Sequence, residues 1–571
     1  MPDCIVTLNS MLPTNSLSRE IDLLSVVVIV TGIVLYGLAY YGYVKWFDKN
    51  VIQSDPKRTT PARTYMDGVE FFPTNRYVLF GFQWKSIAAL GPVLGPILAI
   101  QWGWLPALLW ILFGNIFIGW IHDYTSIMAS VRSEGTSFGP ITYELISPRA
   151  RTILLGYIVF YLILVLSSFA NTVAGTFASF PVSPIPILVV TLVGVLSGYM
   201  VYKFKVNIIY TTVFAVIVMA IGIWLGMLFP ISVPKEIALD FWMLWTLLFC
   251  FVGAVLPIWV FIQPINYMSF YLVYAAVIGI IGGIFAGFPN FSRVAFTSFF
   301  DPKITASGPL WPMMFVTIAC GAISGWHSLI GSSVSSKQLD TEPDAHFIGG
   351  GAMLAEGILA LVALTTVAIL TPEAVAGVAP AGIFIKGGSV LLGNIGLPAA
   401  VGSAYLSVVI IVLAITIMHI ALRISRLALA ELAGPKLGGL FRNVYLTSII
   451  VSAVVYVVTS PRFGAAFGYI WGTFGGANQL MAGMALMIAT LWLTKNKRPT
   501  TYTMVPMLFM LVTTISALIY LAYTGITLYA ADPTRIGAGI AAFINVLLLV
   551  LAFFMCYEGA GAFKKLRAAA K

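Results

Sequence analysis

Apolar runs long enough to cross a membrane recur along this chain, and we count roughly fifteen of them. A spanning helix needs about 20 mostly apolar residues, because the hydrocarbon core is about 30 Å thick. The 571 residues are 60% hydrophobic and only 9% charged, whereas soluble proteins carry about 25% charged residues. We therefore predict an all-α polytopic membrane protein. The approximate limits of the runs are 23–44, 77–100, 104–129, 152–175, 185–202, 207–229, 241–263, 267–288, 309–333, 346–371, 397–422, 443–459, 468–494, 502–526 and 537–556.

The basic residues between the runs predict the orientation of the chain. With an external N-terminus, 23 of the 31 Lys and Arg residues fall in cytoplasmic segments and seven in external ones. Cytoplasmic loops are enriched in Lys and Arg, so we expect the C-terminus in the cytoplasm. The first run, Leu23–Val44, is too long for a signal peptide and is interpreted as a retained span.

Several classes of function are disfavoured by the same pattern. The net charge of +10 is spread over short loops, which argues against nucleic-acid binding. The chain has no phosphate-binding loop motif that would indicate direct use of ATP. The four cysteines are scattered without metal or disulfide spacing. We expect no cofactor, no metal site and no obligatory protein partner.

One span, Tyr77–Ile100, contains a lysine and two Gly-Pro pairs. A charge inside a bilayer is costly, and proline removes a helix hydrogen bond. Both are tolerated where the backbone lines a cavity, as in the broken helices with which transporters hold substrates. The segment ALGPVLGP (Ala89–Pro96) therefore predicts a broken helix beside Lys85.

Four ionisable residues on four different spans reach a similar depth. From the helical rise, Lys85, Asp123, His327 and Glu356 lie roughly 13 to 18 Å from the cytoplasmic edge. This coincidence favours one central site. Lys85 and Asp123 act either as a static ion pair or in coupling, and His327 is either structural or functional. An isolated carboxylate such as Glu356 is suited to carry a proton.

Other polar residues have simpler interpretations. His122 adjoins Asp123 but points about 100° away on a helix, which indicates a helix–helix contact. His419 lies four residues from Arg423 and is expected at the interface. Asn478 and Gln479 are expected to bond neighbouring helices.

An inverted repeat is indicated by a second Gly/Pro-interrupted run. Phe241–Gln263 contains GAVLP at Gly253–Pro257 and comes five spans after the first broken helix, in the opposite direction. Inverted five-plus-five repeats show this arrangement. The predicted division is an N-terminal span and loop at 1–76, repeats at 77–229 and 241–422, and additional spans at 443–571.

Long motifs resemble those of the carbon starvation protein CstA family, over most of the chain from Asp67 to Leu493. The motifs are DGVEFFPTNRYVLFGFQWKSIAALGPVLGPILAIQWGWLPALLW (67–110), HDYTSIMASVRSEGTSFG (122–139), VLPIWVFIQPINYMSFYL (255–272), TIACGAISGWHSLIGSSVSSKQL (317–339), IGGGAMLAEGILALVAL (348–364) and ANQLMAGMALM (477–487). The resemblance implies an inner-membrane importer of peptides or pyruvate, driven by protons and linked to carbon starvation. It also implies a LeuT-like fold of the amino acid–polyamine–organocation type.

The resemblance and the residue pattern together give the expected sites. Substrate binding is assigned to Gly91, Pro92, Gly95, Pro96, Gly253, Pro257 and His327, and coupling to Lys85, Asp123 and Glu356. The chain departs from the family pattern where Phe82 and Gln83 replace two histidines, and where Lys85 replaces a small residue. These departures suggest that the Lys85 ammonium stands where a coupling cation or proton carrier would act.

We therefore predict a secondary active transporter of peptides or pyruvate in the cell inner membrane. Its expected partners are the substrate, a proton or another cation, and membrane lipid. Helix N-termini and main-chain amides at the breaks suit a carboxylate. The alternatives are a passive channel or facilitator, a sodium-coupled transporter, a membrane enzyme using His327 and nearby serines, and a sensor.

Overall fold

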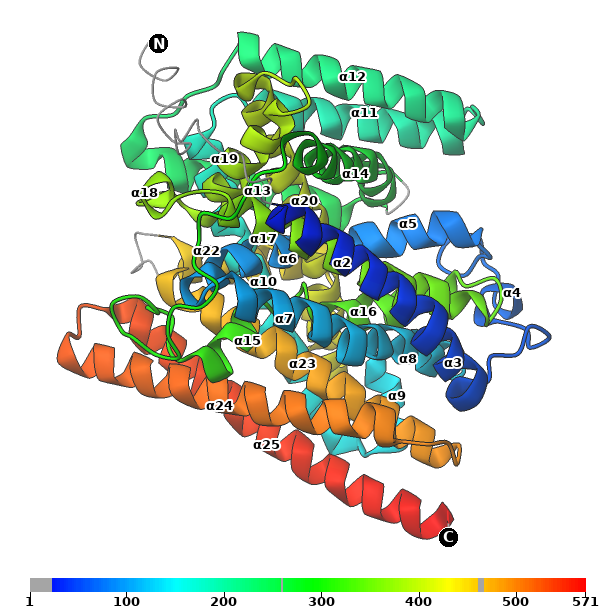
Figure 1. Ribbon diagram of the computed structural model, residues 1–571. Coiled ribbons are helices and arrows are strands. Elements are labelled where there is room, and N and C mark those ends of the chain that lie inside the picture. Colours follow the sequence, from blue (N-terminus) through cyan, green and yellow to red (C-terminus); the bar gives the residue numbers. More distant parts are fainter. Residues whose placement is uncertain (1–22, 258–259, 461–466, 571) are drawn as a thin grey trace.

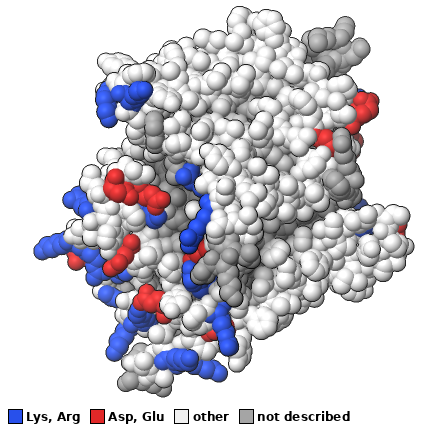
Figure 2. All heavy atoms as spheres, turned by 180° about the vertical axis from the view of Figure 1, so that it is seen from behind, with Lys and Arg blue, Asp and Glu red and all other residues white. Residues whose placement is uncertain are grey.

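The computed structural model describes residues 23–257, 260–460 and 467–570, and its regular secondary structure there is helical. Twelve helices in this part are long and apolar enough to cross a membrane, and the bent pair Arg76–Ile87 and Gly91–Trp102 makes thirteen. Each predicted run corresponds to a helix or a broken helix in Figure 1. Figure 2 shows most of the charged side chains on this face gathered toward one side, with a few at the opposite edge and a broad uncharged surface between them. The prediction of an all-α polytopic membrane protein is confirmed.

The α-helices are α2 (Leu24–Leu38), α3 (Lys45–Phe47), α4 (Pro61–Thr64), α5 (Arg76–Ile87), α6 (Gly91–Ala99), α7 (Trp104–Gly114), α8 (Trp120–Val131), α9 (Phe138–Leu145), α10 (Pro148–Ser179), α11 (Pro184–Tyr202), α12 (Ile208–Leu228), α13 (Lys235–Val255), α14 (Ile262–Gly287), α15 (Phe315–Thr317), α16 (Gly325–Ser333), α17 (Ala352–Ala368), α18 (Pro372–Val375), α19 (Pro380–Gly393), α20 (Ala399–Leu432), α21 (Gly434–Phe441), α22 (Val444–Thr459), α23 (Phe467–Lys495), α24 (Thr501–Ala531) and α25 (Ile536–Ala570). Short 3-10 and π-helical turns extend some of them: η1 (Ala39–Val44), η2 (Asp48–Ile52), η3 (Ile100–Trp102), η4 (Asn115–Gly119), η5 (Leu310–Met314), η6 (Ser335–Lys337) and η7 (His346–Gly351).

The first broken helix is formed by α5 and α6, which meet at an angle of 45°. Helix α5 ends at Ile87, and Ala88 leaves the helical conformation with ψ 84°. Helix α6 begins at Gly91, with Pro92 in its first turn. Proline is tolerated there because the first amides of a helix have no intrahelical acceptor. The predicted break is confirmed, and it lies just before Gly91.

The second broken helix is not where the sequence pattern placed it. Gly253–Pro257 marks the end of α13, and α14 follows as a separate helix. Both helices are long enough to span, so the proline there ends a span instead of interrupting one. The break lies instead between α15 and α16, where Ile318 and Ser324 leave the helical conformation.

The two broken helices run in opposite directions. At one end, the backbone N–H of Thr74, before α5, donates to the carbonyl of Gln338, after α16, at 3.0 Å. At the other end, Nε2 of Gln101, which follows α6, donates to Oγ of Ser307, which precedes α15, at 2.9 Å. We call the first end, which also carries Arg132, the basic end, and the second the distal end.

The packing of the other helices follows the same inversion. Helix α6 of the first broken helix packs on α17, and α16 of the second broken helix packs correspondingly on α8. In the same way, α5 packs on α14 and α15 packs on α23. Helices α10 and α20 pack on each other, as do α13 and α22. We infer one five-span unit of α5–α6, α7–α8, α10, α13 and α14, and a second of α15–α16, α17, α20, α22 and α23. We propose this division in place of the predicted limits 77–229 and 241–422, and in it the α11–α12 hairpin is an insertion within the first unit.

Candidate functional site

Neighbouring side chains satisfy the backbone groups that the two breaks expose. Trp326 Nε1 donates to the carbonyl of Ser86 at 2.7 Å, which joins the second broken helix to the first. Gln479 Nε2 donates to the carbonyls of Phe315 at 2.7 Å and Ile318 at 3.4 Å. Unpaired backbone groups are costly inside a membrane, so these bonds stabilise non-helical backbone at this depth.

Asn478 holds the start of α16. Its Oδ1 accepts from the hydroxyl of Tyr161 at 2.7 Å, the hydroxyl of Ser324 at 3.1 Å and the backbone N–H of Trp326 at 3.2 Å. The prediction that Asn478 and Gln479 bond neighbouring helices is confirmed. Both reach across from α23 to the second break.

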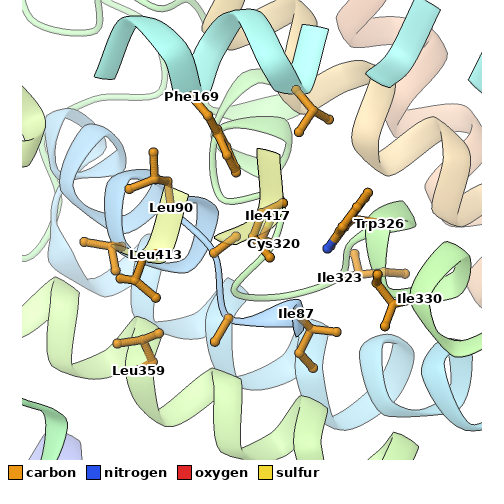
Figure 3. Packing of buried hydrophobic residues seen from close by; sticks show 14 of the residues in the cluster. Ile87, Leu90, Phe169, Cys320, Ile323, Trp326, Ile330, Leu359, Leu413 and Ile417 are labelled. Carbon is orange, nitrogen blue, oxygen red and sulfur yellow. The ribbon is translucent and has the colours of Figure 1, made fainter. Parts of the chain in front are cut away.

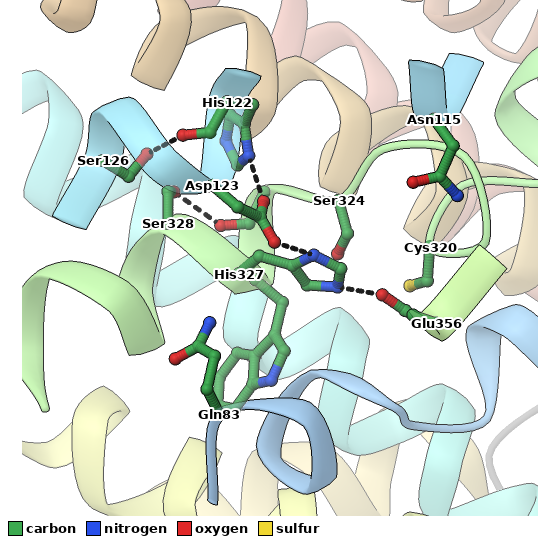
Figure 4. A network of polar contacts seen from close by, with 12 residues as sticks. Gln83, Asn115, His122, Asp123, Ser126, Cys320, Ser324, His327, Ser328 and Glu356 are labelled. Atoms are coloured by element: carbon green, nitrogen blue, oxygen red, sulfur yellow. Dashed lines mark hydrogen bonds and ion pairs between the residues drawn. The ribbon is translucent and has the colours of Figure 1, made fainter. Parts of the chain in front are cut away.

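A buried polar cluster lies beside the second break, and we call His122, Asp123, His327 and Glu356 the His–carboxylate network (Figure 4). Asp123 Oδ1 lies 2.7 Å from His122 Nδ1, and its Oδ2 lies 3.0 Å from His327 Nδ1. On the other side of the ring, His327 Nε2 lies 3.1 Å from Glu356 Oε2. All four side chains are buried. The network therefore joins α8, α16 and α17.

The sequence predicted a similar membrane depth for Asp123, His327 and Glu356, and in the structure these three side chains are in contact. His122 joins them although its Cα–Cβ bond points away from that of Asp123, because its ring turns back to the adjacent carboxylate. The prediction that His122 only contacts another helix is wrong. Helical direction alone does not fix the position of a ring nitrogen two torsions from the backbone.

The network is suited to hold and pass a proton. An imidazole that contacts a carboxylate through each ring nitrogen can take a proton on one side and release it on the other. His327 and Glu356 approach at ion-pair distance without hydrogen-bond geometry. In the described part of the chain, His122 Nε2, His327 Nε2 and both oxygens of Glu356 therefore have no hydrogen-bond partner. Titratable groups with spare bonding capacity, buried away from lipid, are typical of proton pathways.

Lys85 lies outside this network. Its Nζ donates to Thr416 Oγ1 on α20 at 2.7 Å, and only 1% of the side chain is exposed. Among the described residues, no carboxylate lies within ion-pair distance of Lys85. The static Lys85–Asp123 pair is therefore wrong, because Asp123 is held by two histidines instead. Lys85 bridges the first broken helix to α20.

His419 and Gly253 also lie elsewhere than expected. His419 is buried, one helical turn from Thr416, and its ring lies 6.2 Å from that of Phe249. It is not interfacial, because α20 runs through the centre of the molecule. A Cβ added at Gly253 would lie 2.7 Å from His419 Cβ. Gly253 thus allows α13 to approach α20, and Pro257 follows the end of α13, so neither is at the breaks.

The two broken helices cross in close contact. A Cβ added at Gly91 would lie 2.2 Å from Cys320 Sγ, and one at Gly95 would lie 2.9 Å from the carbonyl oxygen of Thr317. Pro92 and Pro96 are buried in the same crossing. Figure 3 shows apolar side chains closing around it, including those of Leu90 and Cys320. The main chain assigned to substrate binding is covered in this conformation.

Replacing Gly91 by Ala should destabilise the protein, because the new methyl group overlaps Cys320 and separates the helices. Overpacking of this kind costs about 1–3 kcal/mol. The midpoint of thermal unfolding in detergent, measured by size-exclusion chromatography, should fall. Gly156→Ala on α10 is the matched control, because its added Cβ meets nothing within 4 Å. Equal midpoints for the two variants would contradict the close crossing.

A cavity of about 1110 Å³ lies at the distal side of the crossing. Leu94 and Leu98 of α6 line it together with Met313 and Thr317 of the second broken helix. Its walls also come from α10, α19, α20, α23 and α24. The cavity thus reaches the second break from the distal end.

At the basic end, an ion pair and a backbone hydrogen bond join segments that no sequence motif brought together. Arg132 donates from Nη2 to Glu342 Oε2 at 2.9 Å and from Nε to Glu342 Oε1 at 3.1 Å. The backbone N–H of Asp55 donates to Glu342 Oε2 at 2.9 Å. These bonds join the segment after α2–η2 to the end of α8 and to the loop before α17. The signal was available in the acidic run DTEPD (340–344) and the basic residues before and after it.

Comparison with known proteins identifies the family. A family model described as carbon starvation protein CstA matches residues 24–391 and 374–517. The chain belongs to this family. The peptide transporter CstA of Escherichia coli is 29% identical over 582 residues, 88% of this chain and 82% of that protein. The peptide transporter CstA of Bacillus subtilis is 27% identical over 93% of this chain and 96% of that protein.

One further relative of this CstA-family chain differs in its name. The pyruvate/proton symporter BtsT of Escherichia coli is 33% identical over 358 residues, and the chain spans about half of its length, 49%. Among solved structures, a manganese transporter of Eremococcus coleocola covers 86% of this chain with a TM-score of 0.49 and 12% identity. That likeness is too low to carry an argument.

The departure at Gln83 has a structural consequence in this CstA-family chain. Gln83 is buried, and its Oε1 accepts a hydrogen bond from the hydroxyl of Ser335, after α16. A glutamine does not titrate. The Gln83 side chain therefore does not itself carry a proton, and it joins α5 to the segment after α16.

Proposed function

We propose that this protein is a secondary active transporter that imports peptides or pyruvate with protons across the cell inner membrane. Membership of the CstA family supports transport, and the names of the relatives supply the two substrate classes and the proton. The observation that carries the proposal is the His–carboxylate network. It connects the second broken helix to two other spans through groups that exchange protons.

The coupling follows from which helices the network joins. His327 lies on α16, while Asp123 and Glu356 lie on α8 and α17. A proton added to or removed from His327 changes the attraction between this histidine and both carboxylates. Because the contacts are buried, that change is large relative to the same change in water. Proton binding thereby alters how firmly α16 is held.

Lys85 acts on the other broken helix. Its bond to Thr416 ties α5 to α20 with an ammonium that no described carboxylate neutralises. In this proposal the ammonium occupies the place of a coupling cation between the two helices. Asp123, Glu356 and Lys85 thus form the coupling machinery, and Gly91, Gly95 and the break near Thr317 form the substrate region.

The conformation is accessible from the distal end and closed at the basic end. The excess of basic residues supports an orientation with the basic end in the cytoplasm, the N-terminus outside and the C-terminus inside. The cavity then opens to the outside, and the Arg132–Glu342 pair closes the inside. Alternating access requires such an asymmetry.

Uptake into liposomes tests the proposed function. Purified protein is given labelled pyruvate or labelled alanyl-alanine under separate inward proton and sodium gradients. We expect accumulation above the external concentration only with the proton gradient, and its loss on addition of an uncoupler. The recovered substrate should be chemically unchanged.

Each alternative has its own result in this experiment. Equilibration without accumulation would indicate a passive facilitator, and accumulation with sodium alone would indicate a sodium-coupled transporter. Recovery of modified substrate would indicate an enzyme. Any of these would overturn the proposal.

A further inference from the structure

A basic residue that has no part in the proposed coupling lines the distal cavity. Lys386 of α19 lines it, and among the described lining residues it is the charged one. The same lining also includes the hydroxyl and amide groups of Asn171, Thr172 and Ser403. No carboxylate is found among the described residues of this lining. Along these walls the cavity therefore offers a positive charge and hydrogen-bonding groups.

The Lys386 ammonium keeps bonding capacity after its internal contact is counted. Nζ donates to the carbonyl of Ala374, just before the end of α18, at 2.8 Å. An ammonium has three donors, so two remain. In the described part of the chain, no carboxylate lies within ion-pair distance of Lys386. The side chain is half-buried, which reduces screening of its charge by water.

A rigid support places this ammonium. Helix α19 packs on α6, α17 and α20, next to both units of the repeat. At Gly387, the residue after Lys386, a Cβ would lie 2.0 Å from the carbonyl oxygen of Thr366. The backbones of α19 and α17 thus touch directly. Lys386 is carried by a packed helix and not by a free loop.

We propose that Lys386 is a substrate-recruiting residue that binds the carboxylate of the incoming substrate in the distal cavity. This rests on the proposed function and adds a specificity-determining position to it. The ammonium attracts the anion and donates two hydrogen bonds to it, while the hydroxyl and amide groups of α10 and α20 accommodate the remainder. In this proposal, the substrate binds at Lys386 before it reaches the second break. It lies apart from the proton network.

The test measures uptake of labelled pyruvate and labelled alanyl-alanine by the full-length protein in liposomes. Lys386→Gln should raise KM for both by about tenfold, as expected for the loss of a charged hydrogen bond, with little change in the maximal rate. Lys386→Arg should retain most of the affinity. Pyruvamide, which lacks the charge, should compete much less well than pyruvate with the unsubstituted protein and equally well with Lys386→Gln.

Lys303→Gln is the matched control, because Lys303 is exposed in the loop before η5 and does not line the cavity. It should leave KM unchanged. A second measurement uses Lys386→Cys treated with a thiol reagent that adds an aminoethyl group or with one that adds a methyl group. Only the aminoethyl group should restore affinity, with the treated unsubstituted protein as reference. The two treatments compare a positively charged and a neutral side chain at position 386 in the same folded variant.

The outcomes separate the two proposals. Uptake by Lys386→Gln with unchanged KM and unchanged preference for pyruvate over pyruvamide would overturn the role of Lys386 alone. An equal effect of Lys303→Gln would do the same, because it would indicate general surface charge. Failure of the unsubstituted protein to take up either probe would overturn the proposed function, and this role with it.

Discussion

Asp123→Asn is expected to abolish proton-driven uptake while leaving exchange of substrate across the membrane. Asp123 contacts both His122 and His327, and an amide of the same size presents one acceptor where the carboxylate presents two. Without the carboxylate, the two histidines lose the group that joins them, so the rate of gradient-driven uptake should fall by at least about 100-fold, which corresponds to about 3 kcal/mol. Substrate exchange between equal concentrations needs no net proton movement, so it should persist.

The measurement compares gradient-driven uptake with exchange in the same liposomes. Asp67→Asn is the control, because Asp67 is an exposed carboxylate outside the spans. Hydrogen bonds from the backbone N–H groups of Val69 and Phe71 lower its pKa, so it stays ionised at neutral pH. That variant should behave as the unsubstituted protein. Proton-driven uptake that survives in Asp123→Asn would contradict the role of the network.

Lys85→Ala is the second large effect. Removal of the ammonium deletes the bond between α5 and α20, so concentrative uptake should be lost while binding and exchange remain. The physical reason is that Lys85 contributes a positive charge between α5 and α20 in addition to its hydrogen bond to Thr416. Thr416→Val removes the acceptor and keeps the lysine, and should therefore reduce uptake without abolishing it.

Comparison of Lys85→Ala with Lys85→Met separates the effect of the lost charge from the effect of the lost side-chain volume. If Lys85 were a structural residue only, Lys85→Met, which keeps most of the side-chain volume, would restore uptake. We expect it to fail as Lys85→Ala does. Unchanged pH-driven uptake in Lys85→Ala would contradict the coupling role directly.

The sequence predicted much of the site because charge is rare inside a membrane. Asp123, His327 and Glu356 stood out at one depth on three spans, and depth along a helix is fixed by its rise. They are in contact in the structure. The first break was predictable for a similar reason, because Gly91 and Pro92 break a helix by their own chemistry.

Other features depend on tertiary contacts that no local pattern encodes. The second break lies in a segment without proline, and Asn478 and Gln479 of a distant helix make it possible. The GAVLP pattern at Gly253–Pro257 carried a stronger local signal but lies at the end of a span. An ion pair of Lys85 with Asp123 was one of two alternatives because the depths agreed, but depth does not fix rotation about the helix axis.

The central claim is that substrate and proton move together through the His–carboxylate network. The most direct measurement uses liposomes with the purified protein, a pH-sensitive dye inside and no initial pH gradient, to which pyruvate or alanyl-alanine is added outside. We predict acidification of the interior with the unsubstituted protein, and none beyond that of empty liposomes with Asp123→Asn. Substrate entry without acidification by the unsubstituted protein would contradict the account.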